Sequence, residues 1–121
     1  DAAGYRVIDG RREGPFGHGN FAILVAEHEN TRVGMCLYTF SFSGWRGRSG
    51  IFVEDLYVDP GQRGSGIGRQ LLMSALEHEA NRGAAFIKLE VTATNTSAVD
   101  FYRKCGFELS ESEAIMAFDK A

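Results

Sequence analysis

The sequence predicts an α+β (mixed α/β) domain with a central, mostly antiparallel sheet and helices on its faces. Two apolar runs, 21–29 and 33–43, are separated only by a short polar turn, which predicts an antiparallel hairpin. A third run, 51–58, leads through a glycine turn into a helical pattern and then into another apolar run at 85–93. That order predicts a parallel crossover unit, so the sheet should be mixed.

Composition limits the class of protein. With 121 residues, of which 44% are apolar and 24% charged, the chain 1–121 is expected to form a single domain. The net charge of -3 argues weakly against a nucleic-acid partner, and the apolar runs are too short to span a membrane. Cys36 and Cys105 lack CxxC spacing, and the three histidines show no metal-ligand spacing with them. We therefore expect reduced thiols, a cytoplasmic location, and no metal.

The two ends of the chain are less regular. Residues 1–20 are rich in glycine and arginine and predict a loop or arm, in which "YRVID" has the composition of a short strand. Residues 44–50 predict a loop. At the other end, "FELSES" and "AIMAFDKA" predict two closing strands.

Two helices are expected. Apolar residues recur at three- and four-residue intervals from Ile67 to Leu76, and Gly83 is placed to end this helix. The segment "TSAVDFYRKC" predicts a second, short helix. Residues 95–97 supply capping side chains for it, and Gly106 closes it.

The glycine turn "DPGQRGSGIGRQLL" (59–72) lies between the third strand and the first helix. Glycines allow an anion to approach the backbone, and the free N–H groups of a helix start attract it. A P-loop is excluded because no lysine follows, and the dinucleotide fingerprint is excluded because Arg69 stands where its third glycine would be. From these residues alone, a phosphate site and a tight packing turn without a ligand both remain open.

The surrounding motifs carry a family resemblance. Arg63, Gly66 and Gly68 match the pattern [Q/R]-x-x-G-x-[G/A] and resemble the pyrophosphate loop of the GNAT superfamily of N-acetyltransferases. "GWRGRSGIFVEDLYVDPGQRGSGIGRQLL" looks like the diamine (spermidine/spermine) acetyltransferase branch, and "NTSAVDFYRKCGF" resembles the second cofactor segment of the superfamily. The resemblance implies the GNAT acyl-CoA N-acyltransferase fold, acetyl-CoA as cofactor, and an acetyl-CoA-binding core at 51–106.

The chain departs from that branch in two places. It has "TATN" where the diamine branch has "DWN" before the second cofactor segment, and its ending after Gly106 also differs, so the acceptor amine stays open. The N-terminal strand and helices of a complete domain are not supplied by 1–20. We expect a partner subunit, in a homodimer, to cover the edge and the apolar surface near "FAILVA".

Acetyl transfer to an amine requires removal of a proton, because an alkyl ammonium has a pKa of about 10. Glu54 is the candidate base. Strand alternation places the adjacent Asp55 on the opposite face unless the strand bulges. The resemblance implies that both acids lie near the substrate, Glu54 as base and Asp55 as a substrate contact. Trp45 is a second candidate for substrate binding, with a lid over the core as the alternative.

Tyr102 is the candidate donor to the leaving sulfur, by resemblance; the alternative is an aromatic anchor for its helix, which Phe101 could also supply. Asn95 would bond the pantetheine amide, cap the helix, or do both. The cofactor contacts implied by the resemblance are Leu56, Tyr57, Val58, Arg63, Gly64, Ser65, Gly66, Ile67, Gly68, Arg69, Asn95, Tyr102 and Arg103.

These residues predict an acetyl-CoA-dependent N-acetyltransferase that acts by direct attack of a small-molecule primary amine, either polyamine-like or amino-acid-like. Two alternatives stay open. One is a shortened acyl-CoA-binding or interaction module without turnover. The other is a protein acetyltransferase acting on lysine or an N-terminal amine.

Overall fold

The computed structural model describes residues 5–9, 21–44, 47–110 and 116–118. The chain divides into two compact units, Asp1–Glu90 (unit 1) and Val91–Ala121 (unit 2). Among the described residues, no helix combines the length and apolar character needed to cross a membrane.

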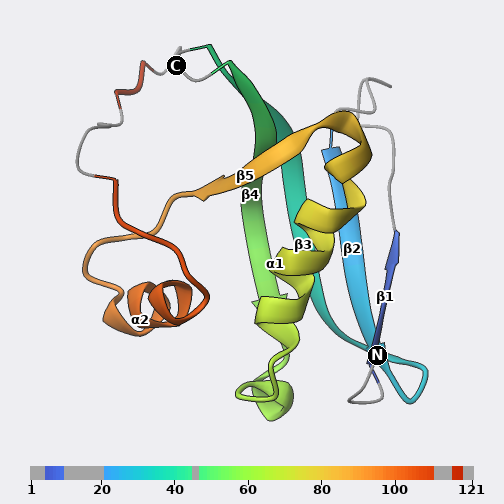
Figure 1. Ribbon diagram of the computed structural model, residues 1–121. Helices are drawn as coiled ribbons and strands as arrows, with labels where there is room; N and C mark the ends of the chain where they lie inside the picture. The colour runs from blue at the N-terminus through green and yellow to red at the C-terminus, as the bar shows by residue number, and fades with distance from the viewer. Residues whose placement is uncertain (1–4, 10–20, 45–46, 111–115, 119–121) are drawn as a thin grey trace. The chain divides into compact units, whose positions relative to one another are not determined.

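Unit 1 is built on a five-stranded sheet with the order β1-β2-β3-β4-β5 (Figure 1). β1 to β4 pair antiparallel with their neighbours, and β5 pairs parallel with β4. The mixed, mostly antiparallel sheet predicted from the sequence is therefore confirmed. The strands are β1 (Tyr5–Asp9), β2 (Phe21–His28), β3 (Thr31–Ser43), β4 (Arg48–Val58) and β5 (Ala84–Leu89).

The hairpin between β2 and β3 forms where the polar turn predicted it. Glu29 and Asn30 both have positive φ, 51° and 63°, as a two-residue turn with the twist of a hairpin requires. On its other side β2 pairs with β1, so the edge of β2 is covered by the chain's own "YRVID" strand. The expected covering of this edge by a partner is thus unnecessary. The rest of the predicted arm lies outside the described residues.

Helix α1 (Ile67–His78) crosses one face of the sheet and supplies most of the helical core (Figure 1). Its apolar stripe at Ile67, Leu71 and Leu72 is almost fully buried, as the periodicity predicts. The helix ends earlier than predicted. Its last residue is His78, and a separate turn of 3-10 helix, η2 (Ala80–Arg82), intervenes before Gly83, whose positive φ of 81° ends η2 instead.

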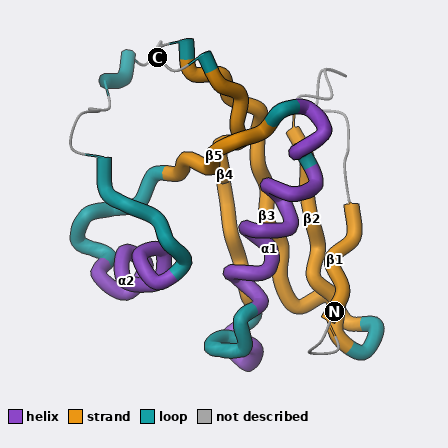
Figure 2. The backbone as a smooth tube through the Cα atoms, viewed as in Figure 1, coloured by secondary structure: helices purple, strands orange, loops and turns teal. Residues whose placement is uncertain are grey.

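The second predicted helix is α2 (Thr96–Lys104), which belongs to unit 2. The closing strands were predicted wrongly for the residues that the structure describes. Phe107–Ser110 and 116–118 are irregular, as the loop colour in Figure 2 shows. Strand propensity alone does not form a strand, because the backbone groups need a partner ladder, and none of the described strands lies beyond β5 in the sheet.

Candidate active site

A β-bulge in β4 places the two predicted acids. Tyr38 pairs with Val53, and the next residue back on β3, Leu37, pairs with Asp55. Glu54 is therefore the extra residue on β4, with no partner opposite it. The bulge therefore interrupts the regular alternation that would place Glu54 and Asp55 on opposite faces.

Both carboxylates lie on the sheet face away from α1. Residues directly opposite one another in an antiparallel pair share a face, so Asp55 lies on the face of Leu37 and, two residues on, of Thr39. The Thr39 Oγ1 donates to Glu54 Oε2 at 3.3 Å, which places Glu54 on that face as well. Glu54 and Asp55 are both exposed. The opposite face carries the buried Tyr38 and Val53.

The glycine turn follows directly. Strand β4 ends at Val58, a short 3-10 turn η1 (Pro60–Gln62) follows, and α1 starts at Ile67. Gly64 and Gly66 have φ of 84° and 89°, and a β-carbon at either position would meet nothing within 4 Å. The turn therefore uses glycine for its backbone conformation and leaves the space around these residues open.

The backbone donors of this turn fit a bound pyrophosphate. The first backbone N–H of α1 with a helical acceptor is that of Gln70, which donates to the Gly66 carbonyl at 3.0 Å. Within the described part of the chain, the N–H groups of Gly66, Ile67 and Gly68 have no protein acceptor. Free donors at a helix N-terminus attract phosphate oxygens, so the predicted cofactor loop has the donors that this role needs.

The last residues of β4 also have backbone groups that no neighbouring described strand pairs with on one side. The parallel pairing of β4 with β5 runs from Ser49 to Val53, where β5 reaches its end at Leu89, but β4 continues to Val58. Among the described strands, none pairs with this outer edge of Leu56–Val58. An extended amide chain such as pantetheine can hydrogen-bond to such an edge as an added strand.

The two arginines of the turn differ in their contacts. Arg63 is exposed, but its Nε donates to the Val58 carbonyl at 3.0 Å, so the side chain ties the turn to the end of β4. Arg69 is exposed on the first turn of α1, and Ser65 donates from its hydroxyl to the Gln62 carbonyl. The contact of Arg63 with Val58 therefore stabilises the turn.

In unit 2, Asn95 caps α2. Its Oδ1 accepts from the Ala98 N–H at 3.2 Å and from the Ser97 hydroxyl at 3.3 Å. The capping alternative for Asn95 is thus observed. The Tyr102 ring packs edge-on against Phe101 and Phe107, with centroid distances of 5.1 and 5.5 Å. Both α2 aromatics are half-buried, so neither is singled out as the sole anchor.

Of the other predicted site residues, Arg103 is exposed near the end of α2, and Trp45 lies outside the described residues. The structure brings Glu54, Asp55 and the glycine turn together on one continuous segment of unit 1, whereas Asn95, Tyr102 and Arg103 belong to unit 2. In the part of the chain that is described, no cluster of three or more histidine, cysteine or acidic residues could hold a metal ion.

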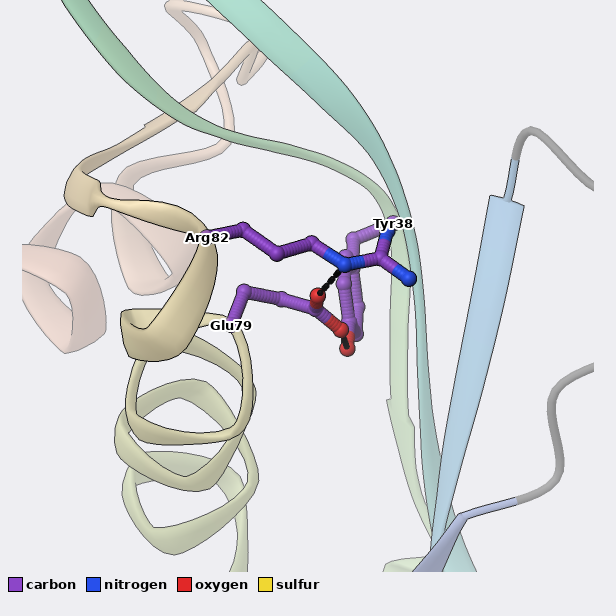
Figure 3. Close-up of polar contacts among 3 residues, drawn as sticks. All are labelled: Tyr38, Glu79 and Arg82. Carbon is purple, nitrogen blue, oxygen red and sulfur yellow. Dashed lines mark hydrogen bonds and ion pairs between the residues drawn. The ribbon is translucent and has the colours of Figure 1, made fainter.

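A buried polar cluster at the far end of α1 was not predicted from the sequence. The Tyr38 hydroxyl donates to Glu79 Oε2 at 2.5 Å, and Arg82 Nε lies 3.5 Å from Glu79 Oε1 (Figure 3). Glu79 is 1% exposed, and the Arg82 guanidinium stacks over the Phe40 ring at 5.0 Å. A pocket of about 430 Å³ opens beside the cluster. No spacing in the sequence marks such a contact between residues 41 positions apart.

Comparison with known proteins agrees with the fold. The family model described as "Acetyltransferase (GNAT) family" matches residues 4–107. The thialysine N-epsilon-acetyltransferase of Mus musculus is 36% identical over 115 residues, covering 91% of this chain and 67% of that protein. The streptothricin acetyltransferase of Streptomyces lavendulae is 45% identical over 67 residues, which cover 55% of this chain and 34% of that protein.

Among solved structures, an integron cassette protein from the mobile metagenome of V. cholerae superimposes with a TM-score of 0.75. The sequences are 24% identical, and the match covers 84% of this chain and 63% of that one, so this likeness concerns the fold alone. The chain spans about two thirds of the length of the proteins that it matches most fully.

The mostly antiparallel sheet, with the parallel β4–β5 crossover through α1, defines the class of protein as a mixed α/β domain. The family match makes the assignment specific: the chain belongs to the acetyltransferase (GNAT) family. Members of this family are N-acetyltransferases that take the acyl group from acetyl-CoA, so the enzyme class and cofactor expected from the sequence are confirmed.

Proposed function

We propose that this chain transfers an acetyl group from acetyl-CoA to a primary amine of a small molecule, with the residues 1–121 acting as one acetyltransferase domain. The observation that carries the proposal is the bulge in β4. It presents Glu54 and Asp55 on one exposed face, and the same strand leads through the short η1 turn to the glycine turn at 63–68.

The bound cofactor supplies an acetyl group activated as a thioester. Glu54, an exposed carboxylate at the bulge, removes the proton from the ammonium form of the acceptor, and the resulting neutral amine attacks the thioester carbonyl. Asp55 attracts the positive charge of the acceptor. Gly66, Ile67 and Gly68 would hold the pyrophosphate through their N–H groups, and Leu56–Val58 would offer the strand edge to pantetheine.

Residues of unit 2 complete the proposal by resemblance to the family. Tyr102 would hold a proton for the departing sulfur, and its ring is fixed by Phe101 and Phe107. The Asn95 Oδ1 is engaged in the helix cap, which leaves its amide N–H groups for the cofactor. Arg103 is exposed and available to the adenosine phosphate. These roles need no change in the contacts that the structure shows within unit 2.

The acceptor is proposed to be a cationic small molecule with a free primary amine. Two adjacent carboxylates on one face favour a positively charged acceptor through simple electrostatics. The match to a thialysine acetyltransferase and to a streptothricin acetyltransferase supports amines of amino-acid or antibiotic type.

The test combines acetyl-CoA calorimetry with thiol release over a panel of thialysine, spermidine, streptothricin and a lysine peptide. We expect binding of acetyl-CoA and turnover of at least one small amine. Glu54→Gln should lower kcat by about 10²- to 10⁴-fold, while the exposed helix residue Glu77, changed to Gln as a control, should leave it unchanged. Binding without turnover on any amine would identify an acyl-CoA-binding module, and preference for the peptide would identify a protein acetyltransferase.

We also propose a homodimer, in which a second copy covers the apolar surface of β2 at Phe21 and Ile23, two strands away from the acids on β4. These side chains are half-exposed and lie on the sheet face that α1 does not cover. Light scattering at micromolar concentration should give the mass of a dimer. A stable monomer that turns over acceptor would contradict this part of the proposal without affecting the rest.

A further inference from the structure

The bulge that exposes Glu54 also removes the usual restraint on its side chain. In a regular ladder, each residue faces a cross-strand partner whose side chain limits its direction. Glu54 has no such partner, because Leu37 and Tyr38 are paired with Asp55 and Val53. A base on a bulge therefore needs another contact to hold it in one direction.

Thr39 supplies the contact that the structure shows. Its Oγ1 donates to Glu54 Oε2 at 3.3 Å, from the neighbouring strand and across the bulge. Thr39 lies in the regular part of β3, where it pairs with Phe52, and it is β-branched, so its χ1 angle has few alternatives. The donor is thus held more firmly than the acceptor that it contacts.

The contact leaves the second carboxylate oxygen available. Among the described residues, Thr39 is the one hydrogen-bond partner of Glu54, and it engages only Oε2. A carboxylate has lone pairs on both oxygens, so Oε1 remains free to accept a proton from an amine. One oxygen is held and the other is presented on the exposed face.

We propose that Thr39 is a positioning residue for catalysis, which holds the bulged Glu54 carboxylate so that Oε1 faces the acceptor amine. The inference rests on the proposed role of Glu54 as the proton acceptor. Thr39 does not itself take part in proton transfer. Its effect appears only through the orientation of Glu54.

The experiment compares Thr39→Val, which keeps the β-branched shape but removes the donor, with Thr39→Ser, which keeps the donor. Thialysine serves as the acceptor. We expect Thr39→Val to lower kcat on the order of tenfold, with an unchanged KM for acetyl-CoA, and Thr39→Ser to stay within about twofold of the wild type. Thr31→Val, at the exposed start of β3, is the matched control and should have no effect.

A double-mutant cycle separates positioning from a general structural effect. In the Glu54→Gln background, Thr39→Val should cause no further loss, since the carboxylate that it orients is gone. Equal losses in both backgrounds would overturn the inference but leave the proposed base intact. If Glu54→Gln itself turned over thialysine at the wild-type rate, both the base and the positioning role would be refuted.

A readout without turnover completes the test. The side-chain carboxyl carbon of Glu54, followed by NMR in the full chain, should change its chemical shift in Thr39→Val and keep it in Thr39→Ser. An unchanged resonance in Thr39→Val, or no turnover of thialysine by the wild type, would overturn the inference.

Discussion

The buried carboxylate of Glu79 allows the sharpest prediction about stability. It closes the C-terminal end of α1 and accepts the hydroxyl of Tyr38 on β3, so it joins the helix to the middle of the sheet (Figure 3). Tyr38 is 0% exposed and Glu79 is 1% exposed, so water cannot replace either partner without opening the core. The change that tests this link is Glu79→Ala.

Three contributions set the expected loss. A buried hydroxyl deprived of its acceptor costs about 1–3 kcal/mol. The Arg82 side chain is 58% exposed, so the loss of its ion pair adds at most about 1 kcal/mol. Removal of one buried methylene group adds about 0.8 kcal/mol. The free energy of unfolding should therefore fall by about 3 kcal/mol, and the Tm by about 10–20 °C for a domain of this size.

Urea denaturation followed by circular dichroism measures the change directly. Glu77→Ala, on the exposed side of the same last helical turn, is the matched control and should stay within about 0.5 kcal/mol of the wild type. Tyr38→Phe combined with Glu79→Ala should cost less than the two single changes added together, because they share one hydrogen bond. If Glu79→Ala unfolds at the same urea concentration as Glu77→Ala, the cluster does not hold the helix to the sheet.

Two further predictions concern the turn and the thiols. Gly66→Ala should weaken acetyl-CoA binding in calorimetry on the order of tenfold, because φ is 89° at Gly66, whereas Gly61→Ala, where no positive φ is required, should bind normally. Burial first, and the charge of Asp55 second, raise the pKa of Cys36 from 9.0 to about 12. Iodoacetamide at pH 8 should therefore label Cys105 and spare Cys36 by mass spectrometry. Because the folded-state pKa is the higher one, this thiol's contribution to stability is present below pH 9.0 and is lost between pH 9.0 and about 12.

The features that could be predicted from the sequence are those set by local periodicity. The β2–β3 hairpin, the buried stripe of α1 and the Asn95 cap each depend on residues close together in the chain, so their spacing is visible in the sequence. The closing strands were predicted on the same grounds and are not observed in the described residues. A strand requires a partner, and the sequence of the strand alone does not supply one.

The end of α1 shows a second limit of local reasoning. Gly83 has the left-handed φ that commonly ends a helix, and the sequence placed the helix end there. The tertiary contact of Glu79 with Tyr38 instead coincides with the end of α1 at His78. Gly83 therefore predicted where the helical region ends, but it did not show that this region contains two helices, α1 and η2, of which it ends only the second.

The bulge in β4 leaves a trace in the sequence, in the spacing of the apolar residues on either side of Glu54 and Asp55. In a regular strand, Val53, Asp55 and Tyr57 would share one face, and Asp55 would be driven into the apolar contact with α1. The observed pairing places Leu56 on the α1 side, opposite Cys36, and leaves Asp55 opposite Leu37 on the open face. The apolar positions Val53 and Leu56 are three residues apart instead of two, which is the spacing that one extra residue produces. The energetic cost of burying a carboxylate thus favours the bulge, and the bulge gives this face two adjacent acids instead of one.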